Sequence, residues 1–126
     1  MAECTLLHAM LPVSDLERSL AFYAEFFGLR EIRRIELELP TRTLVFLGTA
    51  SADPQSMQLE LWYEPGQNVH PTTGHIGIGV KDIAQHLAQL RAGGVPILKE
   101  AAALRPGGRI IALVADPDGH EIELLS

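Results

Sequence analysis

Four ionisable residues have the types and the spacing of a metal site. Glu60 and Glu123 each stand between two aliphatic residues, and His8 and His75 each stand near the start of a mostly apolar stretch. Because side chains alternate between the two faces of a β-strand, each polar group points away from the face of its apolar neighbours. If the apolar faces pack under helices, all four polar groups face a shared cup. These four residues are therefore predicted to hold a metal ion.

The chemistry of this set favours an open site over a structural one. Two imidazoles and two carboxylates without a thiolate suit Zn²⁺, Ni²⁺, Co²⁺ or Mn²⁺ and argue against a closed structural zinc site. Open positions would hold water or substrate. Either histidine alone would more commonly be a hydrogen-bonded structural or surface group. The other histidines are interpreted as linker, helix-surface and turn residues: His70, His86 and His120.

An internal repeat strengthens the ligand interpretation. The two histidines are 67 positions apart and the two glutamates 63 positions apart. Other pairs with the spacing of 67 are Val13 with Val80, Asp15 with Asp82, Leu20 with Leu87, and Ala21 with Ala88. Two histidines and two glutamates at equivalent places in two halves favour a joint role. Each half would leave one face of its sheet exposed if it were alone, and pairing the halves buries that face.

The elements that position these residues recur in the same order. The patterns predict strands over residues 4–11, 29–38, 42–47 and 57–63, a helix over 15–27 and a turn over 48–56. In the second half they predict strands over 75–80 and near 95–99, 109–114 and 119–125, a helix over 82–92 and a mobile loop over 100–108. Ser14 with Glu17 and Asp82 with Gln85 have capping spacing, and Gly28 and Gly93 are predicted to end the helices.

This order predicts an α+β fold made of two βαβββ modules. We expect a single domain over residues 1–126, with module 1 at about 4–63, a breaker-rich linker at 64–73 and module 2 at about 74–126. A chain of 126 residues suits one compact domain.

Composition narrows the cellular setting and the partners. The net charge of -6 and the lack of a basic stripe disfavour nucleic acid as a partner. The single cysteine, Cys4, excludes an intramolecular disulfide and favours a reducing cytoplasm, where we expect it to pack as a small apolar residue. No apolar run approaches the roughly 20 residues of a membrane span, and the N-terminus lacks the order of a signal peptide. A soluble, cytoplasmic protein without a membrane partner is predicted.

The motifs also carry a family resemblance over nearly the whole chain. They are residues 7–11 (LHAML), 15–19 (DLERS) with Phe22 and Tyr23, 59–61 (LEL), 74–76 (GHI) and 116–124 (DPDGHEIEL). This pattern resembles the vicinal oxygen chelate superfamily, and within it the short bacterial glyoxalase I enzymes. The helix and turn motifs are widespread in that superfamily, whereas the His, Glu, His, Glu set is more specific. Glu60 favours glyoxalase I over the epimerases, which carry glutamine there.

The resemblance implies a fold, an assembly and a reaction. It implies that curved mixed sheets of βαβββ modules enclose one divalent metal per site, commonly in a homodimer where each chain supplies two ligands. Ni²⁺ or Co²⁺ is favoured, with Zn²⁺ or Mn²⁺ as alternatives. The implied reaction converts the hemithioacetal of methylglyoxal and glutathione to S-lactoylglutathione through an enediolate, which a Lewis-acidic metal stabilises. Glu123 is assigned as the principal base and Glu60 as its partner in ligation or proton transfer.

Substrate contacts are predicted beside the four ligands. Their candidates are Met10, Trp62, Lys99, Arg105 and Arg109, and the last three could equally be an ordinary solvated surface. Two positions depart from the family pattern. The family places a basic residue four positions after the first histidine and an asparagine four positions after the first glutamate, whereas this chain has Pro12 and Glu64. Both changes disfavour an anionic tripeptide and leave the identity of the thiol open.

Three alternative functions remain open at this point. One is a metal-dependent isomerase, epimerase or lyase that acts on another small oxygen-chelating compound. Another is a binding protein that resembles the bleomycin-resistance proteins, although these generally lack a complete ligand set. A ring-cleaving dioxygenase is weaker, because its iron triad uses two histidines and one glutamate and leaves the second carboxylate unexplained.

Overall fold

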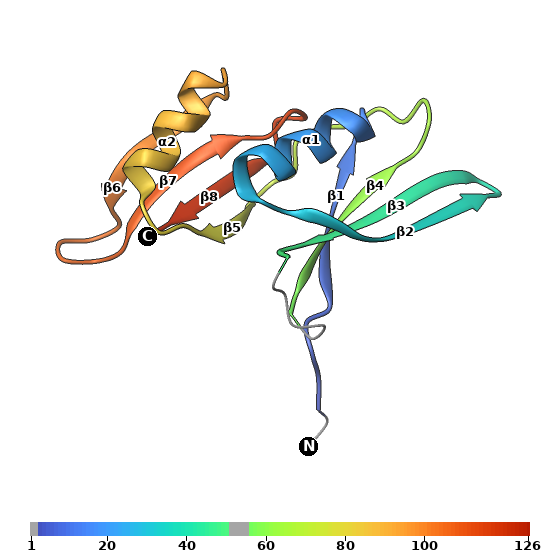
Figure 1. Ribbon diagram of the computed structural model, residues 1–126, viewed down its shortest axis with the longest axis horizontal. Helices are drawn as coiled ribbons and strands as arrows, with labels where there is room; N and C mark the ends of the chain where they lie inside the picture. The colour runs from blue at the N-terminus through green and yellow to red at the C-terminus, as the bar shows by residue number, and fades with distance from the viewer. Residues whose placement is uncertain (1–2, 51–55) are drawn as a thin grey trace. The chain divides into compact units, whose positions relative to one another are not determined.

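The computed structural model describes residues 3–50 and 56–126, which divide into two compact units. The first unit ends at Val69 and the second runs from His70 to Ser126. Each contains a four-stranded sheet and a helix in the order βαβββ, and each unit is described by itself (Figure 1). The predicted α+β fold with repeated βαβββ modules is confirmed. No helix in the described part of the chain is long and apolar enough to cross a membrane.

The first unit is a mixed sheet with one helix. Its elements are β1 (His8–Val13), α1 (Leu16–Phe27), β2 (Arg30–Glu38), β3 (Thr41–Gly48) and β4 (Gln58–Tyr63). The sheet order is β1-β4-β3-β2, in which β1 pairs with β4 in parallel and the other neighbours are antiparallel. The parallel pair brings the N-terminal strand beside β4, although about 50 residues separate them in sequence.

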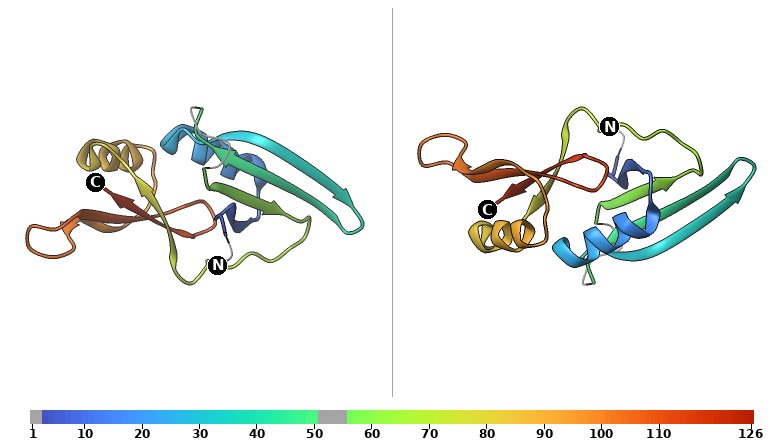
Figure 2. Two further views of the ribbon diagram at one scale, coloured as in Figure 1. Left: turned by 90° about the horizontal axis from the view of Figure 1, so that it is seen from below. Right: turned by 90° about the horizontal axis from the view of Figure 1, so that it is seen from above.

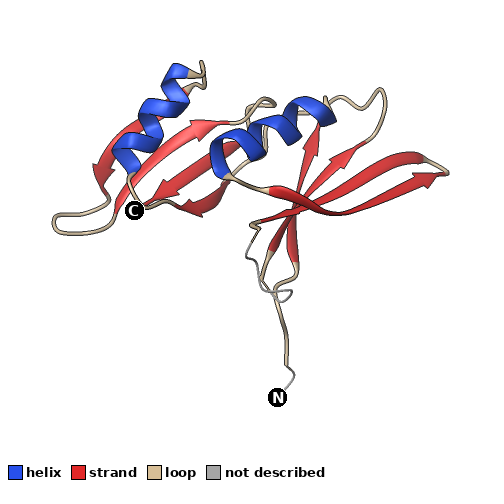
Figure 3. Cartoon of the chain, viewed as in Figure 1, coloured by secondary structure: helices blue, strands red, loops and turns tan. Residues whose placement is uncertain are grey.

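The second unit has the same topology. Its elements are β5 (His75–Gly79), α2 (Ile83–Ala92), β6 (Ile97–Ala103), β7 (Ile110–Ala115) and β8 (Glu121–Leu125), shown in Figure 3. The sheet order β5-β8-β7-β6 matches the first sheet strand for strand, with β5 and β8 parallel. The internal repeat of the sequence therefore corresponds to a repeat of structure.

The helices begin at aspartates that cap them. Asp15 precedes α1 and accepts a hydrogen bond from Arg18 N at 3.1 Å, and Asp82 does the same for Gln85 N at 3.0 Å. The prediction for Asp82 is correct, whereas the predicted cap Ser14 stands one residue too early. Asp15 takes the role because an aspartate in extended conformation directs its carboxylate at the free N–H groups of the first turn.

One face of each sheet is covered by its own helix, as Figure 2 shows from two sides. Leu16, Phe22 and Tyr23 of α1 are buried, as are Ile83, Leu87 and Leu90 of α2. The strands bury alternate residues on the same side, including Leu61, Ile122 and Leu124, each 0% exposed. The opposite sheet face carries the polar residues of interest, as strand alternation predicts.

Two N-terminal predictions are wrong in detail. Residues 3–8 are exposed, including Cys4, and the strand begins at His8 because its pairing with β4 starts only there. The strand also continues through Pro12 to Val13 instead of ending at the proline. Pro12 is tolerated because β1 lies at the edge of its sheet, where one side of the strand needs no ladder donors.

The predicted loop over residues 100–108 is also shorter in the structure. β6 extends to Ala103, and Ala102 and Ala103 pair with Ile111 and Ile110 of β7. Alanines carry little strand signal by themselves, so the pairing partner determines their conformation. In the first half, the core of the predicted turn over 48–56, residues 51–55, lies outside the described residues.

Candidate metal centre

The first histidine and glutamate form a close pair on adjacent parallel strands. Glu60 of β4 is level with Met10 of β1. His8 precedes Met10 by two residues along β1, so it lies on the same sheet face as Glu60. His8 Nε2 and Glu60 Oε1 are 3.6 Å apart. The glutamate side chain is only 8% exposed, whereas the imidazole is 41% exposed. The carboxylate is thus recessed and the imidazole lies at the surface of this unit.

The second histidine and glutamate repeat this geometry. Glu123 of β8 is level with Gly77 of β5. His75 precedes Gly77 by two residues along β5, so it lies on the same sheet face as Glu123. His75 Nε2 and Glu123 Oε1 are again 3.6 Å apart. The imidazole is 44% exposed and the carboxylate 18%. We call the pair His8 and Glu60 the first half-site, and the pair His75 and Glu123 the second half-site.

The spacing within each half-site suits two ligands of one ion. Atoms bound about 2.1 Å from the same ion, at angles of about 90° to 109°, are roughly 3.0–3.4 Å apart. The observed 3.6 Å is near that value and beyond ordinary hydrogen-bond length. Within residues 3–50 and 56–126 no group of three or more His, Cys, Asp or Glu side chains could hold an ion. Each half-site by itself therefore offers two donors, one nitrogen and one oxygen.

Aromatic and aliphatic side chains flank the glutamates. Phe46 of β3 is level with Glu60, and its ring meets the imidazole of His8 edge-on at 5.3 Å. In the second unit Leu113 of β7 is level with Glu123. An apolar neighbour limits the directions from which water reaches each carboxylate.

The predicted substrate-contact residues lie in three places. Met10 and Trp62 lie beside the first half-site, because they share its sheet face on β1 and β4. Lys99 of β6 is level with Leu113 and therefore shares the face of the second half-site, where it is exposed. Arg105 and Arg109 are exposed in the connection between β6 and β7, outside the paired strands.

Sequence reasoning missed a cluster next to Trp62. Arg42 of β3 stacks over the Trp62 ring at 4.9 Å and donates from Nε to Glu64 Oε1 at 3.1 Å. Arg33 of β2 lies similarly over Phe46 at 4.3 Å. The sequence did contain one signal for this cluster, because strand alternation places Arg42 on the same sheet face as Leu44 and Phe46. The pairing of Arg42 with Glu64, 22 residues away, was visible only after folding.

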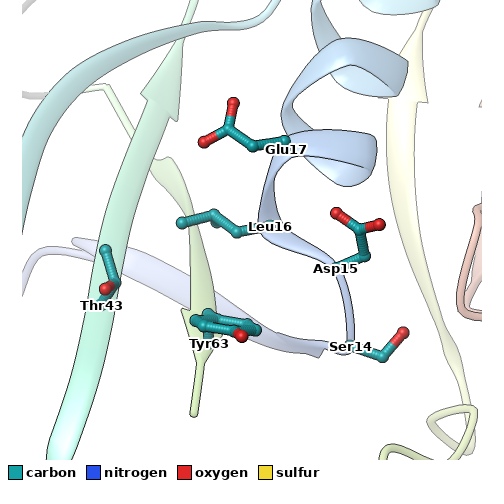
Figure 4. A pocket seen from close by; sticks show the side chains of 6 residues that line it. All are labelled: Ser14, Asp15, Leu16, Glu17, Thr43 and Tyr63. Atoms are coloured by element: carbon teal, nitrogen blue, oxygen red, sulfur yellow. The ribbon is translucent and has the colours of Figure 1, made fainter. Parts of the chain in front are cut away.

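A pocket of about 430 Å³ lies elsewhere in the first unit. Figure 4 shows its lining side chains: Ser14, Asp15, Leu16, Glu17, Thr43 and Tyr63. Tyr63 follows Trp62 directly along β4, so it faces the helix side of the sheet. The pocket is therefore on the face opposite the first half-site and is separate from the candidate ligands.

His120, assigned to a turn, has a structural place. It is 0% exposed, and its Nδ1 accepts a hydrogen bond from Thr72 N at 3.0 Å. Asp116 Oδ1 accepts from the backbone N–H groups of Asp118 and His120, which closes the turn between β7 and β8. This buried imidazole holds residue 72 against the start of β8.

Comparisons with known proteins agree with one another. A family model described as Glyoxalase/Bleomycin resistance protein/Dioxygenase superfamily matches residues 5–124. The lactoylglutathione lyase of Haemophilus influenzae is 40% identical over 123 residues, covering 95% of this chain and 90% of that protein. The trypanothione-dependent glyoxalase I of Leishmania major has a TM-score of 0.84 and 38% identity, covering 98% of this chain and 87% of that one. Maize glyoxalase I has a TM-score of 0.83 and 29% identity, and the match covers 96% of this chain and 44% of the maize chain.

Proposed function

Because this chain belongs to the Glyoxalase/Bleomycin resistance protein/Dioxygenase superfamily and is a glyoxalase I-like enzyme, we propose that it makes S-lactoylglutathione from the methylglyoxal–glutathione hemithioacetal. The observation that carries this proposal is the repeated His–Glu pair, with the same 3.6 Å spacing on equivalent strands of both units. The alternative of a ligand-sequestering protein is not favoured, because the relatives include proteins named as enzymes, lactoylglutathione lyases.

Glyoxalase I enzymes require a divalent metal, and the donors present suit one. We propose that His8, Glu60, His75 and Glu123 hold it together, with Ni²⁺ or Co²⁺ favoured and Zn²⁺ or Mn²⁺ as alternatives. The bound ion would supply Lewis-acid stabilisation of negative charge on the substrate oxygens. Two imidazoles and two carboxylates leave coordination positions open for those oxygens.

Proton transfer is assigned to the glutamates. In the isomerisation one proton leaves the carbon that bears sulfur and hydroxyl, which gives an enediolate, and a proton returns to the neighbouring former carbonyl carbon. Glu123 is the proposed base because its carboxylate is the more exposed of the two, at 18% against 8% for Glu60. A carboxylate that both accepts and returns the proton needs contact with both carbons. Glu60, which is more recessed, would act in ligation or assist the transfer.

The assembly follows from the number of donors. Each half-site offers two, so a four-ligand site needs a first and a second half-site together. We propose that residues 1–126 act as one domain whose modules pair, either within a chain or between the chains of a homodimer. Exposed apolar side chains near the first half-site support pairing, among them Leu6, Leu7 and Met10. A cytoplasmic location is part of the same proposal.

The decisive experiment supplies the reaction components directly. The protein loaded with Ni²⁺ is mixed with methylglyoxal and glutathione, and thioester formation is followed by absorbance. We expect turnover that depends on all three components. A metal-loaded, folded protein that forms no thioester would exclude this substrate and favour a related enzyme that acts on another oxygen-chelating compound.

A further inference from the structure

An aromatic ring contacts the imidazole of the first half-site. Phe46 of β3 is level with Glu60 of β4. Its ring meets the His8 imidazole edge-on, with the centroids 5.3 Å apart and the planes at 78°. Phe46 is only 4% exposed although it lies on the sheet face of the half-site, so neighbouring side chains cover it. The ring is thus a buried wall beside an imidazole whose side chain is 41% exposed.

A β-bulge in β2 places an arginine over this ring. The pairing of β2 with β3 shifts between Glu31 and Arg33, and the extra residue is Ile32. In a regular ladder Ile32 would be level with Phe46, whereas the bulge brings Arg33 to that position and turns its side chain to the face of the half-site. The guanidinium carbon of Arg33 lies 4.3 Å from the centroid of the ring. A cation over an aromatic face is attracted to it, so the stack holds the ring in place.

The His8 imidazole depends on this ring for its orientation. Histidines that bind metals generally donate their second ring N–H to a carboxylate or a carbonyl, and that hydrogen bond fixes the ring. Nε2 of His8 is the nitrogen 3.6 Å from Glu60 Oε1, so Nδ1 is the second nitrogen here. Within residues 3–50 and 56–126 it makes no hydrogen bond. The contact with Phe46 therefore takes the place of that bond.

The second half-site repeats this framework without the ring. The pairing of β6 with β7 also shifts just before Lys99, which is level with Leu113. Leu113 is in turn level with Glu123, so Lys99 and Leu113 occupy the places of Arg33 and Phe46. In the described part of the chain, the imidazole of this half-site has neither a ring contact nor a hydrogen bond. The equal His–Glu distances thus conceal a difference in how firmly the two imidazoles are held.

We propose that Phe46 is a positioning residue for His8 and that Arg33 keeps its ring in place. The ring limits the imidazole to the orientation in which Nε2 lies beside Glu60, so the first half-site is preformed before an ion arrives. This inference rests on the proposed metal centre and goes further, because it makes the two half-sites unequal. The first is ordered by the protein, and the second is ordered by the ion.

The expected size of the effect follows from side-chain rotamers. On a strand two χ1 wells are common, and a histidine ring has about two χ2 orientations, which gives about four arrangements. If one of them presents Nε2 beside the glutamate, a freely rotating imidazole is competent about a quarter of the time. Loss of the ring is therefore expected to weaken metal binding about fourfold.

The test is a double-mutant cycle that is read by metal binding and not by turnover. The Ni²⁺ affinity of the metal-free protein is measured by competition with a chromophoric chelator. Phe46→Leu, which introduces the residue type of the second half-site, is expected to weaken it about fourfold. The same loss is expected in a His75→Ala background, whereas Phe46→Leu is expected to change nothing in a His8→Ala background. The two histidine variants are matched, because each removes the imidazole of an equivalent half-site.

Arginine-to-lysine changes test the stack over the ring. Lysine keeps the charge, so the repulsion of the ion is unchanged, but it lacks the flat guanidinium. Arg33→Lys is expected to weaken Ni²⁺ binding about twofold. Arg34→Lys is the control and is expected to leave the affinity unchanged, because Arg34 is level with the buried Val45 and faces away from the half-site. Equal changes in the two variants would overturn the part assigned to Arg33.

A measurement on the unaltered, metal-free protein does not depend on how the Phe46 variants fold. The ring current of Phe46 shifts nearby imidazole proton resonances in NMR spectra, which are assigned with His8→Ala and His75→Ala. At a pH where both imidazoles are neutral, we expect the His8 resonances to be displaced from those of free histidine and the His75 resonances to lie close to them. His8 resonances at the position of free histidine would overturn the inference.

The outcomes separate this inference from the proposed reaction. No loss of affinity with Phe46→Leu, an equal loss in both histidine backgrounds, or no Ni²⁺ binding by the unaltered protein would overturn the positioning role. Coupling to His8 alone in a protein that forms no thioester would support the positioning role and reject the reaction. Thioester formation without that coupling would do the reverse. Thermal unfolding of each variant checks that it is folded.

Discussion

Replacing Glu123 with glutamine tests whether Glu60 and Glu123, which occupy equivalent positions in the two units, have different roles in catalysis. Both carboxylates lie 3.6 Å from a histidine Nε2, but the Glu123 side chain is 18% exposed and that of Glu60 only 8%. General-base catalysis contributes about 10²- to 10⁴-fold, equivalent to about 3–5 kcal/mol of barrier. We expect Glu123→Gln to lower kcat by that factor. Glu60→Gln is expected to lower kcat only about tenfold at saturating metal.

The assay must separate metal binding from proton transfer. Calorimetric titration with Ni²⁺ measures the affinity of each variant, and kcat is then measured at saturating metal. Because the spacing in the two half-sites is the same, we expect both variants to lose metal affinity to a similar extent. Glu25→Gln is the control, since it makes the same charge change at an exposed residue of α1 that belongs to neither half-site.

The assignment of different roles would be refuted by a clear pattern. If Glu60→Gln and Glu123→Gln lower kcat equally at saturating metal, exposure does not select the base. If Glu123→Gln retains full kcat, that carboxylate moves no proton.

Four further predictions concern metal, space and stability. Chelation should abolish activity, and Ni²⁺ or Co²⁺ but not Zn²⁺ should restore it; full activity of the metal-free protein in a turnover assay would contradict this. Gly79→Leu adds a side chain on the face of β5 that carries His75, where an added Cβ meets nothing within 4 Å, so the melting temperature should change little. If substrate covers the second half-site on that face, kcat/KM should fall at least about tenfold; unchanged kcat/KM would show that substrate does not lie over β5. Ser19→Ala removes a buried hydroxyl that has no hydrogen-bond partner among the described residues, and should raise the free energy of unfolding by about 1 kcal/mol in calorimetry; a decrease would reveal a missed contact. His120→Ala removes a buried imidazole that accepts from Thr72 N, and should lower that free energy by about 3 kcal/mol in urea titration; a loss below about 1 kcal/mol would contradict its anchoring role.

Much of the fold could be predicted because its signals are local. Alternation of apolar residues located most strands, and aspartates before apolar helical patterns located both helices. Gly28 was correctly placed as the end of α1, where its φ of 65° is a backbone conformation that glycine adopts without strain. Gly93 ends α2 with a φ of -82°, and the left-handed residue is Gly94 instead.

Where the predictions were wrong, contacts distant in sequence determined the outcome. Ala102 and Ala103 are strand residues only because Ile111 and Ile110 pair with them. The N-terminal residues before His8 look like a buried strand, yet the partner strand β4 begins only at Gln58. Local propensity is weak in strands, so the presence of a neighbour decides where a strand starts and stops.

The sequence by itself determined the residue types of the candidate site and the sheet face on which each lies, because strand alternation has a period of two. It also determined the repeat that makes His8 equivalent to His75 and Glu60 to Glu123. Only the tertiary structure decided that each histidine lies 3.6 Å from its glutamate, because the parallel register between strands is set by packing across the sheet. For the same reason the Arg42–Glu64 pair, whose members meet across two strands, was invisible until the chain was folded.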